Sequence, residues 1–577
     1  EIARDVMDLV AEYGGAVSGE HGDGRARTQW NRTYYGAELW ERFRELKAAF
    51  DPNWILNPGP VGGDQSGPTD MTADLRYGPG YDFEVPFEPA LNWPNENGFQ
   101  GMTELCHGCG GCTGFTETTG GVMCPTYRAT DEEIASTRGR ANLLRGAMNG
   151  DLPEELLSEE FVTEVLDLCI SCKGCKTDCP SGVDMAKLKA EVVNAYHDRH
   201  GASVRDKLFA NVDRLAGLAS AVAPVANGVT DLPEVRSLLA QTLGIATERS
   251  LPDFTRHTLQ DWWRGRGGSH VSASAADRKA VVFADTYTNY SRVAVGTAAI
   301  RVLEAMGVHV DLCDRTDSGR PAYSKAFVER ARQTAQANVD VLGPRIEAGW
   351  DVVFVEPSDA VMAQTDYLDL LSGEAATTLS ENAFGVMEYV DTFDLDEPVD
   401  WSAPETSLTY HGHCHQKGTN RDHHAAAVLG RVGYEVDELD SGCCGMAGAF
   451  GYEAEHYSMS RAIGEEVVDL VETSDGEVLT APGTSCRTQF EDSDVADGQP
   501  PHPVELLEVA LPERRSVREQ RRVSARRPPA TIPRIAGGSL PFRAVTGPRL
   551  PVGGDSGERT RRTLDSDGRG YASRRRT

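Results

Sequence analysis

The sequence predicts a multidomain α/β protein, and three features of the 577-residue chain point to this class. A chain of this length exceeds what one hydrophobic core normally serves, so several domains are expected. Eight of the thirteen cysteines lie between residues 101 and 200, at spacings typical of metal ligands. From residue 280 onward, short β-branched runs alternate with helical patterns, which predicts βα units and a mainly parallel sheet.

Changes in composition divide the chain into seven segments. In chain order we expect the C-terminal end of a larger domain, a linker rich in Gly, Pro, Asp and Asn, a helical cysteine-dense domain, a helical connector, two copies of an α/β repeat, and a disordered tail. Their expected bounds are 1–62, 63–100, 101–200, 201–279, 280–400, 401–510 and 511–577.

Hydrophobic periodicity places individual elements within these segments. A helix is predicted over 37–50, with its apolar stripe on one face and Asp51-Pro52 at its end. Five strands are predicted in the C-terminal half. They are Val281–Phe283, Val308–Leu312, Val352–Val355, Leu408–His411 and Val478–Ala481.

The charge of the chain is strongly and unevenly acidic. The formal net charge is −31, but the residues from Arg514 onward hold 17 Arg and 5 acids, a balance of +12 that leaves −43 for residues 1–513. Such an acidic body argues against nucleic-acid binding, which requires a basic surface. Only 9 of the 57 basic residues are Lys. An acidic, Lys-poor surface indicates a halophilic protein that stays soluble at high salt, while a GC-rich genome would explain the Lys shortage alone.

The basic tail has no hydrophobic periodicity and is expected to be disordered. Its abrupt change of composition has two explanations: translation past the natural end in another frame, or a basic interaction tail.

The sequence favours a soluble, cytoplasmic protein. The longest apolar run, Leu215–Ala226, has 12 residues and contains Pro224, so it is too short and too broken to span a bilayer. Peripheral attachment at the inner face of the membrane remains an alternative. The tight spacing of the cysteines and the lack of a signal segment indicate a reducing compartment rather than disulfides.

Two cysteine motifs predict two [4Fe–4S] clusters. Each motif is a C-x2-C-x2-C triplet followed further along by a Cys-Pro pair, and in two-cluster ferredoxins the cysteine before Pro serves the other cluster. Zinc sites favour paired rather than tripled cysteines. The expected ligands are Cys106, Cys109, Cys112 and Cys179 for one cluster, and Cys169, Cys172, Cys175 and Cys124 for the other.

Three arginines, Arg138, Arg140 and Arg145, follow the first motif in a predicted helix. As cations beside an anionic cluster they would favour its reduced form and raise its potential. The alternative is that they lie on a solvated helix face.

The C-terminal half contains an internal repeat in which only the second copy keeps its cysteines. Three motifs of the first copy, around Asp285, Ser318 and Asp359, recur 126 to 129 residues later around Cys414, Cys444 and Cys486. The constant offset indicates two copies of one βα unit with ligands at its strand ends. Cys313 is expected to be a packed core cysteine.

The second copy offers sulfur ligands for a further redox site. Cys414, Cys443, Cys444 and Cys486 come from separate loops and could bind a third iron–sulfur centre, or Cys443 and Cys444 could form a redox thiol pair. His413 and His415 could add ligands or tune a thiol pKa. The alternative is that these residues are remnants, as in the first copy.

Several motifs in a fixed order resemble those of flavin-linked 2-hydroxyacid dehydrogenases fused to an iron–sulfur subunit. SGEHGDGR (18–25) and FDPNWILNPG (50–59) resemble the end of the FAD-linked oxidase C-terminal domain of the family, whose members are similar to glycolate oxidase, D-lactate dehydrogenase and D-2-hydroxyglutarate dehydrogenase. The tandem cluster motifs and the CCG repeats match the electron-transfer half of the family.

The resemblance assigns roles to residues that would otherwise read as parts of Gly-rich turns. It implies that Glu20 is a divalent-metal ligand, that His21 is a substrate-facing acid/base, and that Asn57 and Pro58 lie close to FAD. By the same resemblance, the FAD-binding domain would precede residue 1, so the chain is expected to be an N-terminally truncated and incomplete enzyme.

The function predicted from the resemblance is electron transfer within a flavin-dependent 2-hydroxyacid dehydrogenase. Electrons from a 2-hydroxy acid would leave FAD through the two clusters for an acceptor, either a quinone or a carrier protein. The alternatives are a heterodisulfide-reductase-like thiol/disulfide enzyme and a separate electron-transfer subunit that docks onto a FAD-bearing partner chain.

Overall fold

The computed structural model describes residues 2–16, 18–60, 62, 76–78, 80–114, 123–153, 155–230, 232–496 and 498–512. The predicted basic tail lies outside the described residues from position 513 onward, as do residues 63–75 of the predicted linker.

The N-terminal segment consists of α1 (Ile2–Glu12) and α2 (Gly24–Phe50). The backbone of α2 breaks at Gly36, where φ is 77°, so the predicted helix over 37–50 is its second half. The helix ends at Asp51, whose buried carboxylate accepts hydrogen bonds from Lys47 and from two backbone amides of the following turn. The predicted apolar stripe is present but largely exposed, with Leu39, Leu46 and Phe50 uncovered.

The cysteine-dense segment is helical, as predicted, and closes around its own apolar core. Leu144, Leu166 and Leu188 are fully buried at its centre. Its elements are α3 (Gly98–Glu104), η1 (Gly111–Thr113), α5 (Pro125–Thr130), η2 (Glu133–Ala135), α6 (Thr137–Met148), α7 (Glu159–Phe161), η3 (Val162–Leu166), α8 (Gly174–Asp178) and α9 (Met185–His200).

The described end of the predicted linker is docked rather than free. The backbone amides of Ala90 and Leu91 and the indole of Trp93 all donate hydrogen bonds to the buried carboxylate of Glu191 on α9. Residues 80–97 therefore run as an irregular strap against the helices, with Leu91 buried.

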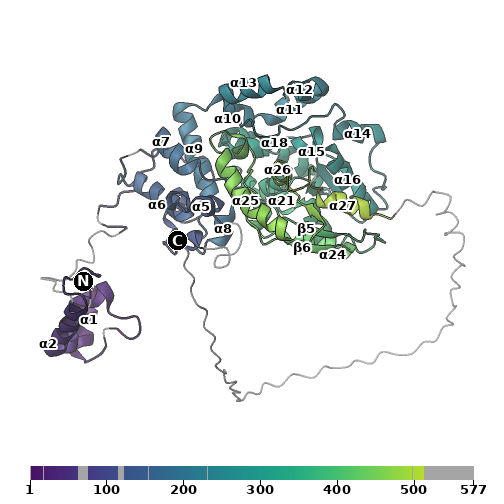
Figure 1. Cartoon of the computed structure of the whole chain (residues 1–577). Helices are drawn as coiled ribbons and strands as arrows, with labels where there is room; N and C mark the ends of the chain where they lie inside the picture. Colours follow the sequence, from purple (N-terminus) through teal and green to yellow (C-terminus); the bar gives the residue numbers. More distant parts are fainter. Residues whose placement is uncertain are drawn as a thin grey trace, which may run out of the picture. The chain divides into compact units, whose positions relative to one another are not determined.

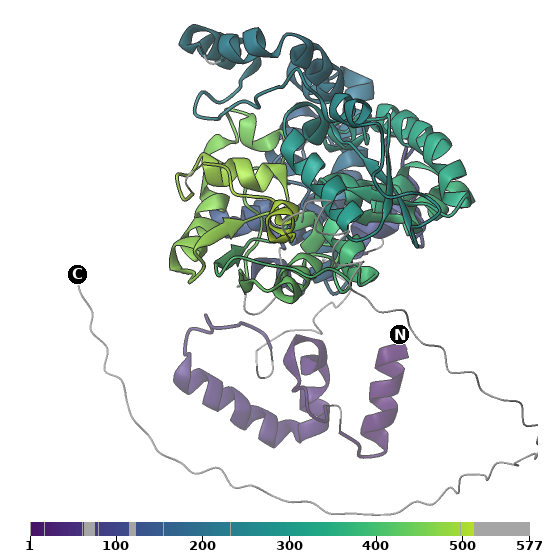
Figure 2. The ribbon, with the colours of Figure 1, turned by 90° about the vertical axis from the view of Figure 1, so that its right-hand side faces the viewer.

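The connector is helical, as expected, and its first four helices lie at the edge of the body in both views (Figures 1 and 2). Leu259 of its last helix is instead buried with Ala280 and Val282 of the first sheet. The connector comprises α10 (Val204–Phe209), α11 (Val212–Ala221), α12 (Ala223–Thr230), α13 (Pro233–Leu243) and α14 (Leu259–Arg266). None of the described helices is long and apolar enough to cross a membrane.

The C-terminal half contains two parallel sheets with the same internal order. One has the order β2-β1-β3-β4 and the other β6-β5-β7, and all described pairs are parallel. In each, the first strand of the copy lies between the second and the third, as the internal repeat predicts. The strands are β1 (Lys279–Phe283), β2 (His309–Leu312), β3 (Asp351–Phe354), β4 (Ala383–Gly385), β5 (Ser407–Tyr410), β6 (Glu435–Glu438) and β7 (Val478–Thr480).

Helices cover both sheets and join them into one core. Val282 and Val353 of the first sheet share an apolar cluster with Leu408 and Tyr410 of the second. The C-terminal helix closes it by packing on α16 of the first copy. The helices and turns are α15 (Thr286–Tyr290), α16 (Val293–Ala305), α17 (Arg320–Ser324), α18 (Val328–Glu347), α19 (Pro357–Val361), η4 (Met362–Asp366), α20 (Tyr367–Leu370), α21 (Glu374–Glu381), α22 (Val386–Thr392), α23 (Cys414–Lys417), α24 (His423–Val432), η5 (Phe450–Tyr452), α25 (Tyr457–Thr473), α26 (Thr484–Glu491) and α27 (Pro503–Ala510).

Candidate iron–sulfur and thiol centres

One small cavity is lined by a complete cysteine set of the sequence prediction. The thiols of the first triplet and of the second Cys-Pro pair surround it, together with Met123 and Arg138. The backbone amide of Arg138 donates to the sulfur of Cys112 over 3.3 Å. Amide donors of this kind stabilise a thiolate ligand, so the cavity has the chemistry of a cluster site.

The two triplets have the same backbone shape despite different sequences. Gly108 and Gly110 of the first motif have φ of 79°, and their counterparts Ser171 and Lys173 in the second have φ of 55° and 65°. A non-glycine residue in this left-handed region is strained and persists only where its surroundings impose it. Each motif therefore wraps around its own centre, and the two motifs do so with the same backbone shape.

The cysteines of the second set lie near the start of α6. Cys124 has φ of 56° and its thiol donates to the carbonyl of Ala135 over 3.0 Å. Burial raises the pKa of Cys175, and its neighbours Cys169 and Cys124 raise it further. Thiols this close and this buried favour binding of a shared metal centre over three separate thiolates.

Of the three candidate arginines, Arg140 lies closest to this set. Its buried guanidinium reaches the sulfur of Cys124 over 3.9 Å and also donates to Val165 and Thr126. Arg138 pairs instead with Glu133, and Arg145 donates to the carbonyl of Arg76. The structure thus supports a cation beside a cluster for Arg140, not for Arg145.

The remaining cysteine site is built at the carboxyl edge of the second sheet. Cys414 begins α23 after β5, Cys443 and Cys444 lie in the loop after β6, and Cys486 lies in the first turn of α26 after β7; all four are buried. Parallel strands end at the same edge, so three loops distant in the sequence converge there. Gly445 is required by space and conformation, because its φ is 85° and a Cβ would lie 2.2 Å from the carbonyl oxygen of Ser460.

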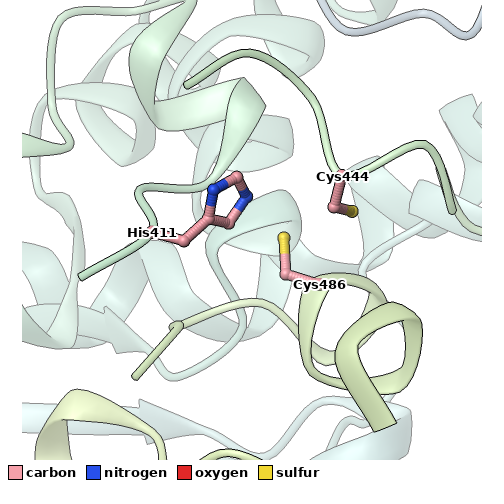
Figure 3. Close-up of side chains that lie close together, drawn as sticks. All are labelled: His411, Cys444 and Cys486. Carbon is pink, nitrogen blue, oxygen red and sulfur yellow. The ribbon is translucent and has the colours of Figure 1, made fainter. Parts of the chain in front are cut away.

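His411 joins two of these cysteines in a group with the donor set of a metal site. Ligand atoms of His411, Cys444 and Cys486 lie within 4.8 Å of one another, and all three residues are buried (Figure 3). Nδ1 of His411 is hydrogen-bonded to Ser441 over 2.8 Å, whereas Nε2 has no hydrogen-bond partner among the described residues. An imidazole oriented in this way is typical of metal ligands. Imidazole with thiolates suits zinc or iron.

Sequence reasoning missed His411 and considered His413 and His415 instead. The signal was present in the alternation H-G-H-C-H, because His411 is the last residue of a predicted strand and so lies at the strand end from which the cysteine motif starts. His413 caps α23 through its Nδ1, which accepts from the amide of His415.

Thiol–thiol hydrogen bonds tune the pKa values within this group. Hydrogen bonds from Cys443 and Cys486 hold the pKa of Cys444 well below its usual range, and the contact with His411 acts in the same direction. The pKa values of Cys443 and Cys486 are raised by their side-chain hydrogen bonds and by burial. Cys444 is therefore the thiol of the set that ionises most readily, as expected for a metal ligand or a nucleophile.

The second cluster motif and the thiol centre are in contact. Cys172 belongs to the same buried apolar cluster as Cys414 and Cys443. Nε2 of His415 lies 3.1 Å from the carbonyl oxygen of Ser171, and Thr177 donates to the carbonyl of Gly418. Residues about 240 positions apart are thus packed together, which brings two predicted redox sites side by side.

The first copy of the repeat faces the same region with carboxyl groups. Asp359 accepts from Ser318 over 2.6 Å, and Glu356 accepts from the amide of Thr484 at the start of α26. Burial raises the pKa of Asp285 to about 6 and that of Asp359 well above its usual value. Cys313 is buried in the apolar core, as predicted.

Comparison with known proteins finds three family models along the chain. Residues 1–61 match the C-terminal domain of FAD linked oxidases, residues 102–183 a 4Fe-4S dicluster domain, and residues 408–491 a cysteine-rich domain. The order of the three is the order expected from the motifs. The matched segments are similar to the iron–sulfur electron-transfer portion of FAD-linked dehydrogenases.

Individual relatives agree with this assignment. The chain is 28% identical to D-2-hydroxyglutarate dehydrogenase of Escherichia coli over 559 residues, which are 88% of this chain and 53% of the relative. It is 28% identical to a subunit of the anaerobic glycerol-3-phosphate dehydrogenase over 58% of this chain and 83% of that relative, and 24% identical to the glycolate oxidase iron-sulfur subunit over 71% and 94%, both of E. coli.

The chain spans about half the length of the D-2-hydroxyglutarate dehydrogenases that it matches. No solved structure matches it significantly.

In the N-terminal segment, the residues expected near FAD lie on exposed turns. His21 and Glu20 contact each other, with Nε2 and Oε1 3.0 Å apart and side chains 79% and 84% exposed. Asn57 has φ of 46°, and both Asn57 and Pro58 are exposed. The described residues therefore do not enclose a flavin or substrate site around them.

Proposed function

We propose that this chain carries electrons within a FAD-dependent 2-hydroxyacid dehydrogenase, from FAD through two [4Fe–4S] clusters toward an acceptor such as a quinone. The observation that carries the proposal is the contact between the second cluster motif and the thiol centre, through Cys172, Cys414 and the His415–Ser171 approach. Redox sites in contact support direct electron transfer between them.

The proposed ligand sets are those of the sequence analysis. Cys106, Cys109, Cys112 and Cys179 hold one cluster, and Cys124, Cys169, Cys172 and Cys175 hold the other. The shared cavity of the first set and the common backbone shape of the two triplets support this assignment. When bound, [4Fe–4S] clusters accept and release single electrons. The residues of the chain hold them, exclude water and supply Arg140 as a nearby cation.

For the thiol centre we propose a third metal-bound site, with His411, Cys444 and Cys486 as ligands and Cys414 and Cys443 beside them. The free Nε2 of buried His411 supports this choice over a redox thiol pair. A thiol/disulfide enzyme remains the second candidate, because Cys443 and Cys444 interact directly and differ in pKa.

We propose that the N-terminal segment completes a FAD-linked oxidase domain. Glu20 would bind a divalent metal, His21 would act as the acid/base toward a 2-hydroxy acid, and Asn57 and Pro58 would approach FAD. The exposed apolar stripe of α2 supports burial against further protein, either in a longer chain or on a FAD-bearing partner. D-2-Hydroxyglutarate, D-lactate and glycolate are the candidate substrates. The two relatives named as subunits favour a separate electron-transfer chain as the alternative.

We further propose a cytoplasmic location with peripheral attachment to the inner face of a membrane. Helices α11 and α12 pack their small residues inward, with Ala216 and Ala223 buried, and turn larger apolar residues outward, with Leu218 71% and Val225 67% exposed. Residues 215–230 contain no charged side chain, although the chain as a whole carries many. This reversed distribution suits a lipid surface.

Iron analysis tests the proposed cofactors. After anaerobic reconstitution, we expect about eight irons per chain, or about twelve if the thiol centre holds a cubane cluster. Electron paramagnetic resonance of the reduced protein should show two interacting clusters. Replacing His411 with Ala should remove the metal of the thiol centre and leave the two clusters in place. The control is Cys313→Ser, which changes a buried cysteine outside the site and should leave all of the metal in place. Stoichiometric zinc without iron would refute the cluster assignment.

Flotation with phospholipid vesicles tests membrane attachment. Wild-type chain should float with the vesicles, and Leu218→Glu with Val225→Glu should abolish this. Val341→Glu with Leu470→Glu, a matched change of two exposed apolar residues on α18 and α25, is the control. If wild type stays in solution, or forms a dimer that the double variant disrupts, the lipid assignment is wrong.

A further inference from the structure

A further group of metal-binding side chains lies where α22 of the first repeat copy packs on α24 of the second. Ligand atoms of Asp391, His423 and His424 lie within 4.8 Å of one another. Asp391 belongs to the last turn of α22, and the two histidines are the first residues of α24. The group consists of two imidazoles and one carboxylate, and no cysteine belongs to it. It is therefore distinct from the iron–sulfur and thiol centres.

The carboxylate of Asp391 is held in place with one oxygen facing the histidines. Nδ1 of His424 lies 2.6 Å from Oδ2 of Asp391, and Arg431 contacts Oδ1 over 2.7 Å. The side chains of Asp391 and His424 are each only 17% exposed. The exposed ring of His423 lies beside the ring of His424, with the ring centres 4.1 Å apart. Two of the three side chains are thus largely buried, and the third borders on solvent.

The charges around this group favour a bound cation. Arg431 also contacts the buried carboxylate of Asp396, through Nε and Nη2. Two carboxylates therefore share one guanidinium, which leaves one negative charge to be balanced. Burial opposes ionisation of Asp391, but hydrogen bonds with His424 and Arg431 outweigh burial and hold the pKa of this carboxyl below its usual value. Asp391 is thus in the ionised form that a metal ligand requires.

We propose that Asp391, His423 and His424 bind a divalent transition-metal ion of the zinc, nickel and cobalt class. Imidazole ligands suit these metals, whereas magnesium and calcium prefer oxygen ligands. Three protein ligands leave a coordination position open to water, since even a tetrahedral site requires four. Arg431 orients the carboxylate through its other oxygen, as hydrogen-bonding partners of metal ligands commonly do. The inference goes beyond the proposed electron transfer and does not depend on it.

The role of His423 separates a metal ion from a proton as the balancing charge. A proton shared by Asp391 and His424 satisfies these two groups alone, whereas a metal ion also uses His423 as a ligand. On binding, the metal ion takes the place of the proton between Nδ1 of His424 and Oδ2 of Asp391, and this proton passes to solvent. Because the ligands come from both copies of the repeat, the bound ion ties the two copies together.

Calorimetric titration of the anaerobically reconstituted full chain with nickel chloride tests the inference, with magnesium chloride as the control metal. His423→Gln removes an exposed ligand without disturbing the core and should weaken Ni²⁺ binding at least about tenfold. His424→Gln should have the same effect. The matched control is His270→Gln, which changes an exposed histidine beside the carboxylate of Glu304 and should bind Ni²⁺ as wild type does.

Thermal unfolding gives a second readout, because a ligand that binds only the folded protein stabilises it. Excess Ni²⁺ should raise the Tm of wild type and of His270→Gln, but not that of His423→Gln. Absence of Ni²⁺ binding, or equal binding by wild type and both ligand variants, would overturn the metal site. Full binding by His423→Gln alone, or equally strong binding of Mg²⁺, would also overturn it. Cluster signals in electron paramagnetic resonance test only the proposed function, so the two failures can be told apart.

Discussion

At the residue scale, the cysteine motifs specify more than ligand spacing. Glycines adopt the left-handed backbone conformation in the first motif, whereas Ser171 and Lys173 adopt the same conformation in the second. For non-glycine residues such strain costs about 1–3 kcal/mol, which must be offset by the surrounding contacts. Lys173 has such a contact, because its buried ammonium group pairs with Asp366.

Arg140 allows a prediction about cluster potential. Replacing it with Gln should lower the midpoint potential of the second cluster by about 60 mV or more. The reason is that a buried cation beside Cys124 favours the reduced form of the cluster. For one electron, about 60 mV corresponds to a tenfold change in the redox equilibrium constant. A redox titration followed by electron paramagnetic resonance measures this. Arg140→Lys retains the charge and should shift the potential less. Equal potentials in all three proteins would show that Arg140 has a purely structural role.

At the scale of elements, buried ion pairs join the iron–sulfur helices to the α/β repeats. Lys173 lies 2.5 Å from Asp366, and Lys187 on α9 lies 2.6 Å from Asp369. Paired charges in such surroundings are costly to separate, because removal of one partner leaves the other buried and uncompensated. The relative position of the two redox sites therefore depends on these pairs.

The Asp366 pair predicts an asymmetry between two variants. Asp366→Asn should destabilise the protein by about 3–5 kcal/mol, because it leaves both Lys173 and Arg320 unpaired. Lys173→Met should cost less, since Arg320 still neutralises Asp366. Glu508→Gln breaks a partly exposed pair with Arg301 and should cost at most about 1 kcal/mol. Thermal unfolding of the reconstituted proteins measures all three, and equal losses for the first two would contradict this account.

His456 predicts a pH dependence at the contact between η3 and α25. Burial lowers its pKa, but ion pairs with Asp167 and Glu453 outweigh burial and raise the pKa to about 9. The folded-state pKa thus exceeds the unfolded value of about 6.5. The stabilisation is therefore fully present below about pH 6.5 and is lost as the pH rises through 9.

The difference in Tm between wild type and His456→Gln measures this effect. It should be large at pH 6 and close to zero at pH 10. His257→Gln, a change of an exposed histidine, serves as the control for the titration itself. A difference that stays constant with pH would exclude a charged His456.

At the scale of the whole molecule, acidic charge dominates the surface. A net charge of −31 destabilises a compact fold through self-repulsion, and dissolved salt screens this repulsion. If the protein is halophilic, its Tm should rise steadily as KCl increases from about 0.1 M to 2 M, well beyond the concentration at which the Debye length falls below 10 Å. A Tm that does not change above about 0.5 M would favour the genome-composition explanation.

Much of the architecture followed from local sequence patterns. Cysteine spacing predicted the cluster motifs, and β-branched runs predicted five of the seven described strands. The two missed strands have physical reasons: β4 reads A-F-G and has no β-branched residue, and β6 reads E-V-D-E because it is an exposed edge strand. The constant offset of the repeat predicted two copies of one βα unit, and the two sheets share one internal strand order. These signals are local, so they can be recognised in the sequence without knowledge of the fold.

The functional neighbourhoods depended on packing between distant parts of the chain. His411 meets Cys444 and Cys486 because three parallel strands end at one edge, and Cys172 meets Cys414 because the helical domain docks on that edge. A cavity lined by both apolar and charged residues lies where these units meet the connector. The sequence alone therefore revealed the cysteine ligands but not His411. Their grouping required the three-dimensional structure, because contacts across about 240 residues arise from the burial of shared surfaces and leave no local pattern.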